Sequence, residues 1–201
     1  MSGRLIVVSG ASQCGKTTKV MQLIRNEKRV IAWDIEDQFS KMPGFQRVTS
    51  KAELLRLAQM PGAYKLAYVV GGDLKAGFDY WAGCVNYAGR YVGGLTCVAE
   101  ELADVTTPSK APGNWGILLR RGLKRDINII AISQRWAEAD KTAMGNASEF
   151  IMFRTSTADD SKYLASKTRV EQSEIDGLKP FEFLRYDAVT REKTRGKVQK
   201  R

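Results

Sequence analysis

The sequence contains no histidine, and this absence excludes imidazole catalysis and metal sites that depend on histidine ligands. Cysteine is scarce as well, with only Cys14, Cys84 and Cys97. Their odd number and wide spacing fit neither a disulfide framework nor a zinc-binding pattern. Free cysteines are typical of proteins in a reducing environment, so we expect the protein to act in a cytoplasm.

Long hydrophobic runs are also missing. No apolar stretch approaches the roughly 20 residues that a transmembrane helix needs, and the apolar run near the N-terminus is too short for a signal peptide. We therefore expect no transmembrane segment, and a role at a membrane would need a partner. The 201 residues are 43% hydrophobic and 27% charged, which suits a single domain with a substantial core.

The charge is strongly unbalanced, with a formal net charge of +10 at pH 7. Residues 189–201 hold much of this excess, since they contain one acid and six basic residues. The basic residues are Arg191, Lys193, Arg195, Lys197, Lys200 and Arg201. We expect residues 1–188 to form the folded core and residues 189–201 to be a flexible tail. The charge favours a polyanionic partner such as nucleic acid, although a basic tail can also serve solubility alone.

A glycine-rich motif near the N-terminus is the most informative stretch of the chain. Residues 10–17 read GASQCGKT and fit the pattern G-x-x-x-x-G-K-[ST] of a phosphate-binding loop. In such a loop, successive backbone N–H groups converge on an anion, and the following helix adds its positive N-terminal end. The residues expected to bind ATP are Gly10, Ala11, Ser12, Gln13, Cys14, Gly15, Lys16, Thr17 and Thr18.

Two residues of this motif have individual roles in the prediction. Lys16 can reach the β- and γ-phosphates of ATP, and the Thr17 hydroxyl can bind Mg²⁺. The context agrees with the motif. Residues 5–8 predict a buried parallel strand before the loop, and residues 19–24 predict a helix after it.

Two further predicted strands end in acidic residues. Residues 29–33 lead into the acids of 34–37, and residues 95–99 lead into Glu100 and Glu101. Such acids are expected at the carboxyl edge of an open α/β sheet, where ligands bind. Because neighbouring side chains diverge at a strand end, we assign Glu100 to the Mg²⁺ shell and Glu101 to the base that activates water.

The remaining pattern alternates strands and helices, which predicts an α/β fold with a mostly parallel central sheet flanked by helices. A capping box at residues 50–53 predicts a helix start, and the periodicity of residues 78–91 predicts another helix, whose Phe78 and Trp81 we expect in the core. The other strands are expected at residues 63–70, 128–133, 149–154 and 182–186.

Polar residues near the later strands complete the candidate site. The Gln134 amide, at the end of the strand 128–133, can donate to a γ-phosphate and accept from the attacking water. Arg121 and Arg125, after Trp115 on a predicted helix, are candidates for an arginine finger that reaches a neighbouring subunit. Arg120 and Arg154 are further candidates, and a solvated basic face is the alternative for the helix.

In this order, the motifs resemble those of the FtsK–HerA superfamily of P-loop ATPases. More narrowly, the chain looks like the small genome-packaging ATPases of tailless icosahedral double-stranded DNA viruses with an internal membrane. Residues 129–135, IIAISQR, are similar to the family's sensor strand, which ends in Thr/Ser-Gln-Arg, and Asp34 matches the family's acid after its second strand. One departure is the pair Glu100-Glu101, because the family's usual pair is Asp-Glu.

The resemblance implies a RecA-like (ASCE) core over about residues 4–186 that assembles as a homo-oligomeric ring, hydrolyses ATP between subunits and moves double-stranded DNA into a preformed capsid. It implies capsid or membrane-vertex partners and a place in the host cytoplasm or at the packaging vertex of the virion. By the same resemblance, Lys16 and Thr17 bind phosphate and Mg²⁺, Glu100 supports the metal, Glu101 is the base and Gln134 is the sensor.

Two other functions remain open from the residues. The phosphate loop and the chain length also suit a small-molecule kinase of the nucleoside type. A virion assembly factor that depends on nucleotide without turning it over is the second alternative. The adjacent acids favour hydrolysis over phosphate transfer, because a kinase must exclude water from its site.

Overall fold

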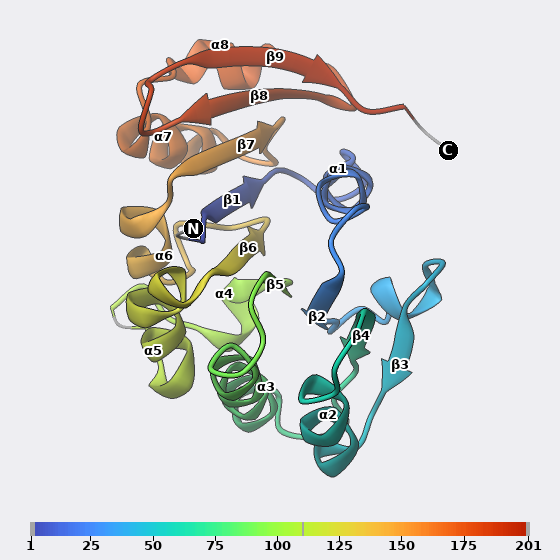
Figure 1. Ribbon diagram of the computed structural model, residues 1–201. Helices are drawn as coiled ribbons and strands as arrows, with labels where there is room; N and C mark the ends of the chain where they lie inside the picture. Colours follow the sequence, from blue (N-terminus) through green and yellow to red (C-terminus); the bar gives the residue numbers. More distant parts are fainter. Residues whose placement is uncertain (1–2, 110, 200–201) are drawn as a thin grey trace.

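The computed structural model describes residues 3–109 and 111–199. Within these residues, one nine-stranded sheet has the order β3-β4-β2-β5-β6-β1-β7-β8-β9 (Figure 1). The strands are β1 Leu5–Ser9, β2 Arg29–Trp33, β3 Gln46–Val48, β4 Tyr64–Tyr68, β5 Leu95–Ala99, β6 Ile127–Ser133, β7 Glu149–Phe153, β8 Glu182–Asp187 and β9 Lys193–Lys197.

The first seven strands of the chain pair in parallel, and β8 and β9 are antiparallel additions at one edge. Every residue of β1, β5 and β7 is buried, as expected for strands covered on both faces. The predicted α/β fold with a mostly parallel sheet is therefore confirmed.

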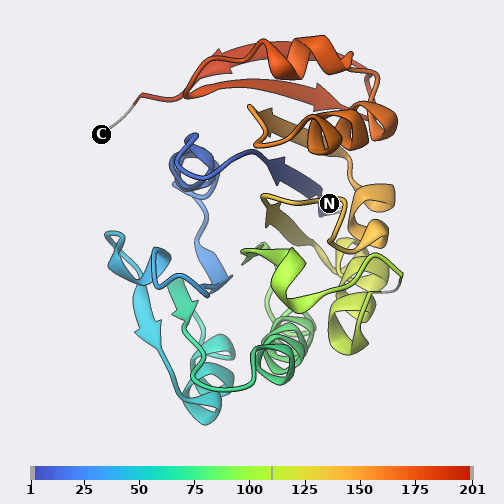
Figure 2. The same ribbon diagram turned by 180° about the vertical axis from the view of Figure 1, so that it is seen from behind.

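Helices cover both faces of the sheet (Figures 1 and 2). The α-helices are α1 Lys16–Leu23, α2 Lys51–Ala58, α3 Leu74–Ala88, α4 Leu102–Val105, α5 Gly113–Arg121, α6 Lys141–Asn146, α7 Ala158–Lys167 and α8 Gln172–Asp176. Two 3₁₀ helices are η1 Phe39–Lys41 and η2 Leu123–Arg125. α1 packs into one core cluster through Val20 and its C-cap residue Ile24, while α2, α3, α5 and α7 pack into the other. No helix of the described residues is long and apolar enough to cross a membrane.

Phe78 and Trp81 of the predicted helix lie in the core, as expected, whereas Tyr87 and Tyr91 are exposed. Phe78 and Trp81 of α3 are fully buried and stack with ring centroids 5.4 Å apart. Phe78 also meets Trp33 of β2 and Trp115 of α5, each at 5.4 Å. α3 begins earlier than the periodicity indicated, because the Asp73 side chain accepts from the Ala76 N–H and caps the helix there.

The C-terminal segment differs from the expectation of a flexible tail. Residues 193–197 form β9, which pairs with β8 in the register Leu184↔Arg195. Val198 is 1% exposed, and its N–H donates to the Phe181 carbonyl at 2.9 Å. The pairing with β8 and the buried Val198 side chain hold this segment in place, although its sequence is almost entirely polar. Of the predicted tail, Lys200 and Arg201 lie outside the described residues.

Candidate nucleotide-binding site

The predicted phosphate loop connects β1 to α1 at the carboxyl edge of the sheet. Gly10 and Gly15 have φ angles of 149° and 111°, a region that disfavours side chains. The space is also closed, since a Cβ at Gly10 would lie 2.6 Å from Phe153 Cβ, and one at Gly15 would lie 2.6 Å from Val198 Cγ2. Both glycines of the motif are therefore required by the shape of the loop.

Lys16 lies across this loop and is 9% exposed. Its ammonium group donates to the carbonyl oxygens of Gly10 and Ala11 at 2.8 and 2.7 Å. Burial lowers the pKa of Lys16, while nearby negative groups, Glu101 and Glu100 among them, oppose this shift. Phosphate oxygens of a nucleotide can replace the two carbonyls as partners and would stabilise the charged form.

A pocket of about 480 Å³ opens beside the loop. It brings together the predicted phosphate loop, both acids that follow β5 and the glutamine that follows β6. Its lining residues are Ser12, Gln13, Gly15, Lys16, Thr17, Thr18, Glu36, Gln38, Glu100, Glu101, Gln134 and Phe181. The geometry predicted from the strand ends is thus present in the fold.

Glu100 is the most perturbed acid in this pocket. It is 4% exposed, and its Oε2 atom has no hydrogen-bond partner among the described residues. Burial, together with the negative charges of Asp34, Glu101 and Glu36, raises the pKa of Glu100 to about 8. A cation beside it would satisfy the unpaired oxygen and lower that pKa.

These residues fit a Mg²⁺ ion that arrives with a nucleotide. Within the described parts of the chain, no group of three or more His, Cys, Asp or Glu side chains could hold a metal ion by itself. Mg²⁺ commonly takes one or two protein ligands and completes its shell with substrate phosphates and water. Thr17 and Glu100, which line the same pocket, would supply that kind of partial site.

Glu101 adopts a left-handed backbone conformation, with a φ of 44°. Its Oε1 accepts a hydrogen bond from Gln134 Nε2 at 2.9 Å, which joins the end of β5 to the end of β6. A glutamate in this region is unusual, and such strain is concentrated at functional sites. The two side chains expected to handle the attacking water are therefore in direct contact.

Sequence reasoning missed two lining residues, Gln38 and Phe181, and placed Glu36 only among the acids expected at the ligand edge. Gln38 Oε1 accepts a hydrogen bond from the Thr17 hydroxyl at 3.1 Å. The fully buried Asp34 carboxylate accepts from the N–H groups of Gln38, Phe39 and Ser40 at 2.7, 3.1 and 2.8 Å. Asp34 thus shapes the loop after β2 and places Gln38. The acids after β2 were a visible signal for Glu36, whereas nothing in the sequence marked Gln38.

The candidate arginine fingers do not meet this pocket. Arg121 ends α5 and Arg125 ends η2, directly before the amino end of β6, while Gln134 follows its carboxyl end. The seven residues of β6 separate the two edges by about 20 Å. Arg120 lies beside Arg121, whereas Arg154 follows β7 at the same edge as the phosphate loop, where its carbonyl accepts from the Ala11 N–H at 2.8 Å.

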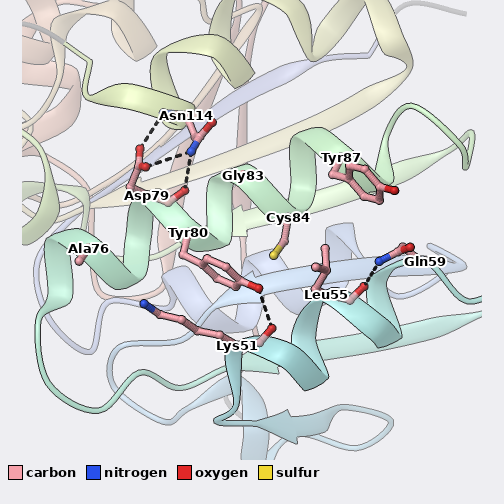
Figure 3. A pocket seen from close by; sticks show the side chains of 10 residues that line it. All are labelled: Lys51, Leu55, Gln59, Ala76, Asp79, Tyr80, Gly83, Cys84, Tyr87 and Asn114. Carbon is pink, nitrogen blue, oxygen red and sulfur yellow. Dashed lines mark hydrogen bonds between the residues drawn. The ribbon is translucent and has the colours of Figure 1, made fainter.

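A larger hollow of about 780 Å³ lies between α2 and α3, away from these residues (Figure 3). Its polar groups largely bond to one another. Asp79 accepts from the Asn114 side chain at 3.0 Å, and the Tyr80 hydroxyl donates to the Lys51 carbonyl at 2.9 Å. Because the acids and the phosphate loop converge elsewhere, we place the candidate site at the smaller pocket.

A phosphate loop after β1, a buried acid after β5 and a glutamine after β6, on a mostly parallel sheet, define the P-loop NTPase fold. No family model matches the sequence. The chain is similar to the genome packaging NTPase B204 of Sulfolobus turreted icosahedral virus 2, solved with AMPPCP. The TM-score is 0.79 at 17% identity, over 96% of this chain and 97% of that one. VirB4 of Thermoanaerobacter pseudethanolicus has a TM-score of 0.67 at 10% identity, over 98% of this chain and 89% of that one.

One curated relative is Protein P9 of Pseudoalteromonas phage PM2. It is 28% identical over 137 residues, which span 68% of this chain and 62% of P9. The P-loop NTPase fold expected from the motifs is thus confirmed, and it is similar to the fold of solved viral packaging NTPases.

Proposed function

We propose that the protein hydrolyses ATP to move double-stranded viral DNA into a preformed capsid. The observation that carries this proposal is the convergence of Lys16 and Thr17 with Glu100, Glu101 and Gln134 in one pocket. The similarity to the packaging NTPase B204, over nearly the whole of both chains, supports the packaging role.

The residues divide the chemistry among them. Lys16 exchanges its two carbonyl partners for phosphate oxygens and holds the triphosphate against the loop. Mg²⁺, when bound with the nucleotide beside Thr17 and Glu100, would neutralise phosphate charge. Glu101 orients the attacking water and accepts its proton. Gln134, which is hydrogen-bonded to Glu101, would also contact the γ-phosphate and so link it to the base.

The arginines at the opposite edge support action between subunits. A head-to-tail contact between two copies sets the amino edge of one sheet against the carboxyl edge of the next, and such contacts form rings when the rotation closes. Arg121 is exposed at that edge, while Arg125 is half-buried, so Arg121 is the better placed finger. We therefore propose a homo-oligomeric ring with shared sites.

The partners follow from charge and from the resemblance. The net charge of +10 favours DNA as the polyanion that the ring moves. Capsid or membrane-vertex proteins are the proposed docking partners, and the host cytoplasm, during virion assembly, is the proposed place of action.

The decisive experiment is steady-state ATP hydrolysis across protein concentration, with and without double-stranded DNA. We expect the rate per subunit to rise with concentration and again with DNA, and Lys16→Ala to abolish turnover. A flat rate that ignores DNA and depends on an added small acceptor would instead support a kinase.

A further inference from the structure

Phe181 is the one aromatic residue among those that line the nucleotide pocket in the described parts of the chain. We infer that its ring is the stacking surface for the base of the bound nucleotide. This inference rests on the proposed function, because it assigns the base subsite of the same pocket.

The backbone at Phe181 is costly for an aromatic residue. Lys179, Pro180, Phe181 and Glu182 form a tight turn, in which the Glu182 N–H donates to the Lys179 carbonyl at 3.0 Å. Phe181 has a φ of 67°, at the turn position where glycine is normally found after a proline. A glycine would relieve the strain. The presence of a large ring at this position therefore indicates that the side chain has a function.

The surroundings hold the ring beside the phosphate loop. The Phe181 carbonyl accepts from the Val198 N–H at 2.9 Å, which ties the turn to the end of β9. Phe181 Cδ1 would lie 3.3 Å from a Cβ at Gly15, so the ring borders the loop itself. The residue packs against the core cluster around α1 and remains only half-buried, which leaves part of the ring open to the pocket.

The sheet order gives the nucleotide its direction. The acids and Gln134 come from the ends of β2, β5 and β6, on one side of β1, and they mark the γ-phosphate end. Phe181 directly precedes β8, on the other side of β1. With the phosphate loop between them, a triphosphate that points its γ-phosphate at Glu101 carries its base towards Phe181.

The test compares a ligand that has a base with one that lacks it. We would measure the affinities of a non-hydrolysable ATP analogue and of inorganic tripolyphosphate by calorimetry, with Mg²⁺, for wild type, Phe181→Leu, Phe181→Gly and Phe181→Tyr. Leucine keeps apolar bulk and backbone strain, glycine removes both, and tyrosine keeps an aromatic face. Arg191→Gly is the matched control, because Arg191 has a φ of 66° in the turn between β8 and β9.

We expect the leucine and glycine variants to bind the ATP analogue about ten- to hundredfold more weakly, as the loss of one stacked base predicts, and to bind tripolyphosphate as wild type does. Tyrosine should rescue binding, and Arg191→Gly should leave both affinities unchanged. Unchanged analogue affinity in Phe181→Leu, or equal losses for both ligands, would overturn the inference alone. Wild-type protein that binds neither ligand would overturn the proposed function as well.

Discussion

Glu100 is a single buried side chain that links the candidate nucleotide pocket to the pH dependence of folding stability. Its carboxyl is protonated up to about pH 8 in the folded chain, because burial and the charges of Asp34, Glu101 and Glu36 disfavour the ionised form. In the unfolded chain the same group ionises near pH 4.5. The unfolded state therefore loses its proton first, and stability falls as the pH rises between these two values.

We predict that Glu100→Gln stabilises the nucleotide-free protein at pH 8.5 and has little effect at pH 5. The neutral amide removes the buried charge, and each kcal/mol recovered should raise the melting temperature by roughly 2–4 °C. Thermal unfolding at both pH values measures the effect. Glu192→Gln, at an exposed position, is the control and should show no such pH dependence. An equal effect of Glu100→Gln at both pH values would contradict the buried charge.

Glu101 offers a separate test, of chemistry rather than stability. We predict that Glu101→Gln keeps ATP binding but lowers turnover by about 10²- to 10⁴-fold, the usual contribution of a general base. The substitution preserves an oxygen that can accept from Gln134, so the contact between the strand ends should survive. Equilibrium binding and steady-state rates together check this, and normal turnover in the variant would refute the role of the base.

For single residues of the candidate site, the sequence predicted those that belong to motifs. It missed those that reach the pocket only through the course of the folded chain. Lys16, Thr17, Glu100 and Gln134 follow buried strands or lie in the phosphate loop, so their common edge could be inferred. Gln38 and Phe181 come from loops whose course depends on Asp34 and on the end of β9. No local pattern reveals such long-range support.

Among the elements, the central strands were predictable because continuous apolar runs mark strands buried on both faces. β9 was not predictable in this way. Its sequence, KTRGK, has exposed side chains and no apolar alternation. It is held by pairing with β8, by a 2.9 Å ion pair between Lys193 and Glu174 of α8, and by the buried Val198 that follows it. The charge and polarity of this segment suggested a flexible tail. In the structure it is an edge strand, where charged and polar residues discourage pairing with further strands.

Because Val198 packs at Gly15, the C-terminal strand supports the phosphate loop directly. We predict that a chain ending at residue 188 loses thermal stability and nucleotide affinity together, whereas a chain ending at Val198 retains both. Melting curves and nucleotide titrations of the two truncated proteins check this. If the shorter chain kept full nucleotide affinity, β9 would be dispensable for the loop.

On the scale of the whole molecule, the acids and Arg121 lie at opposite edges of the sheet, so the proposed shared site would need two chains. Glu101 lies at the carboxyl edge of the sheet and Arg121 at the amino edge, so one chain cannot bring the two together, whereas adjacent copies in a head-to-tail ring can. A finger supplied by a neighbour stabilises charge in the transition state and is commonly worth about 10³- to 10⁵-fold in rate. Each interface of the proposed ring would then need Glu101 from one subunit and Arg121 from the next.

This arrangement predicts recovery of activity in mixtures of two inactive variants. Arg121→Ala and Glu101→Gln should each abolish most ATP hydrolysis when alone. Mixed in equal amounts, they form some interfaces with an intact Glu101 facing an intact Arg121, and these should restore a clear fraction of the rate. Glu101→Gln combined with Arg121→Ala in the same chain, added to either single variant, is the control, because it carries neither an intact Glu101 nor an intact Arg121 and so restores no interface. The same mixtures with Arg125→Ala and Arg120→Ala identify which arginine acts. Recovery with none of the three would mean that the sites are not shared in this way, and that an arginine at the carboxyl edge, such as Arg154, is the one to test within the same subunit.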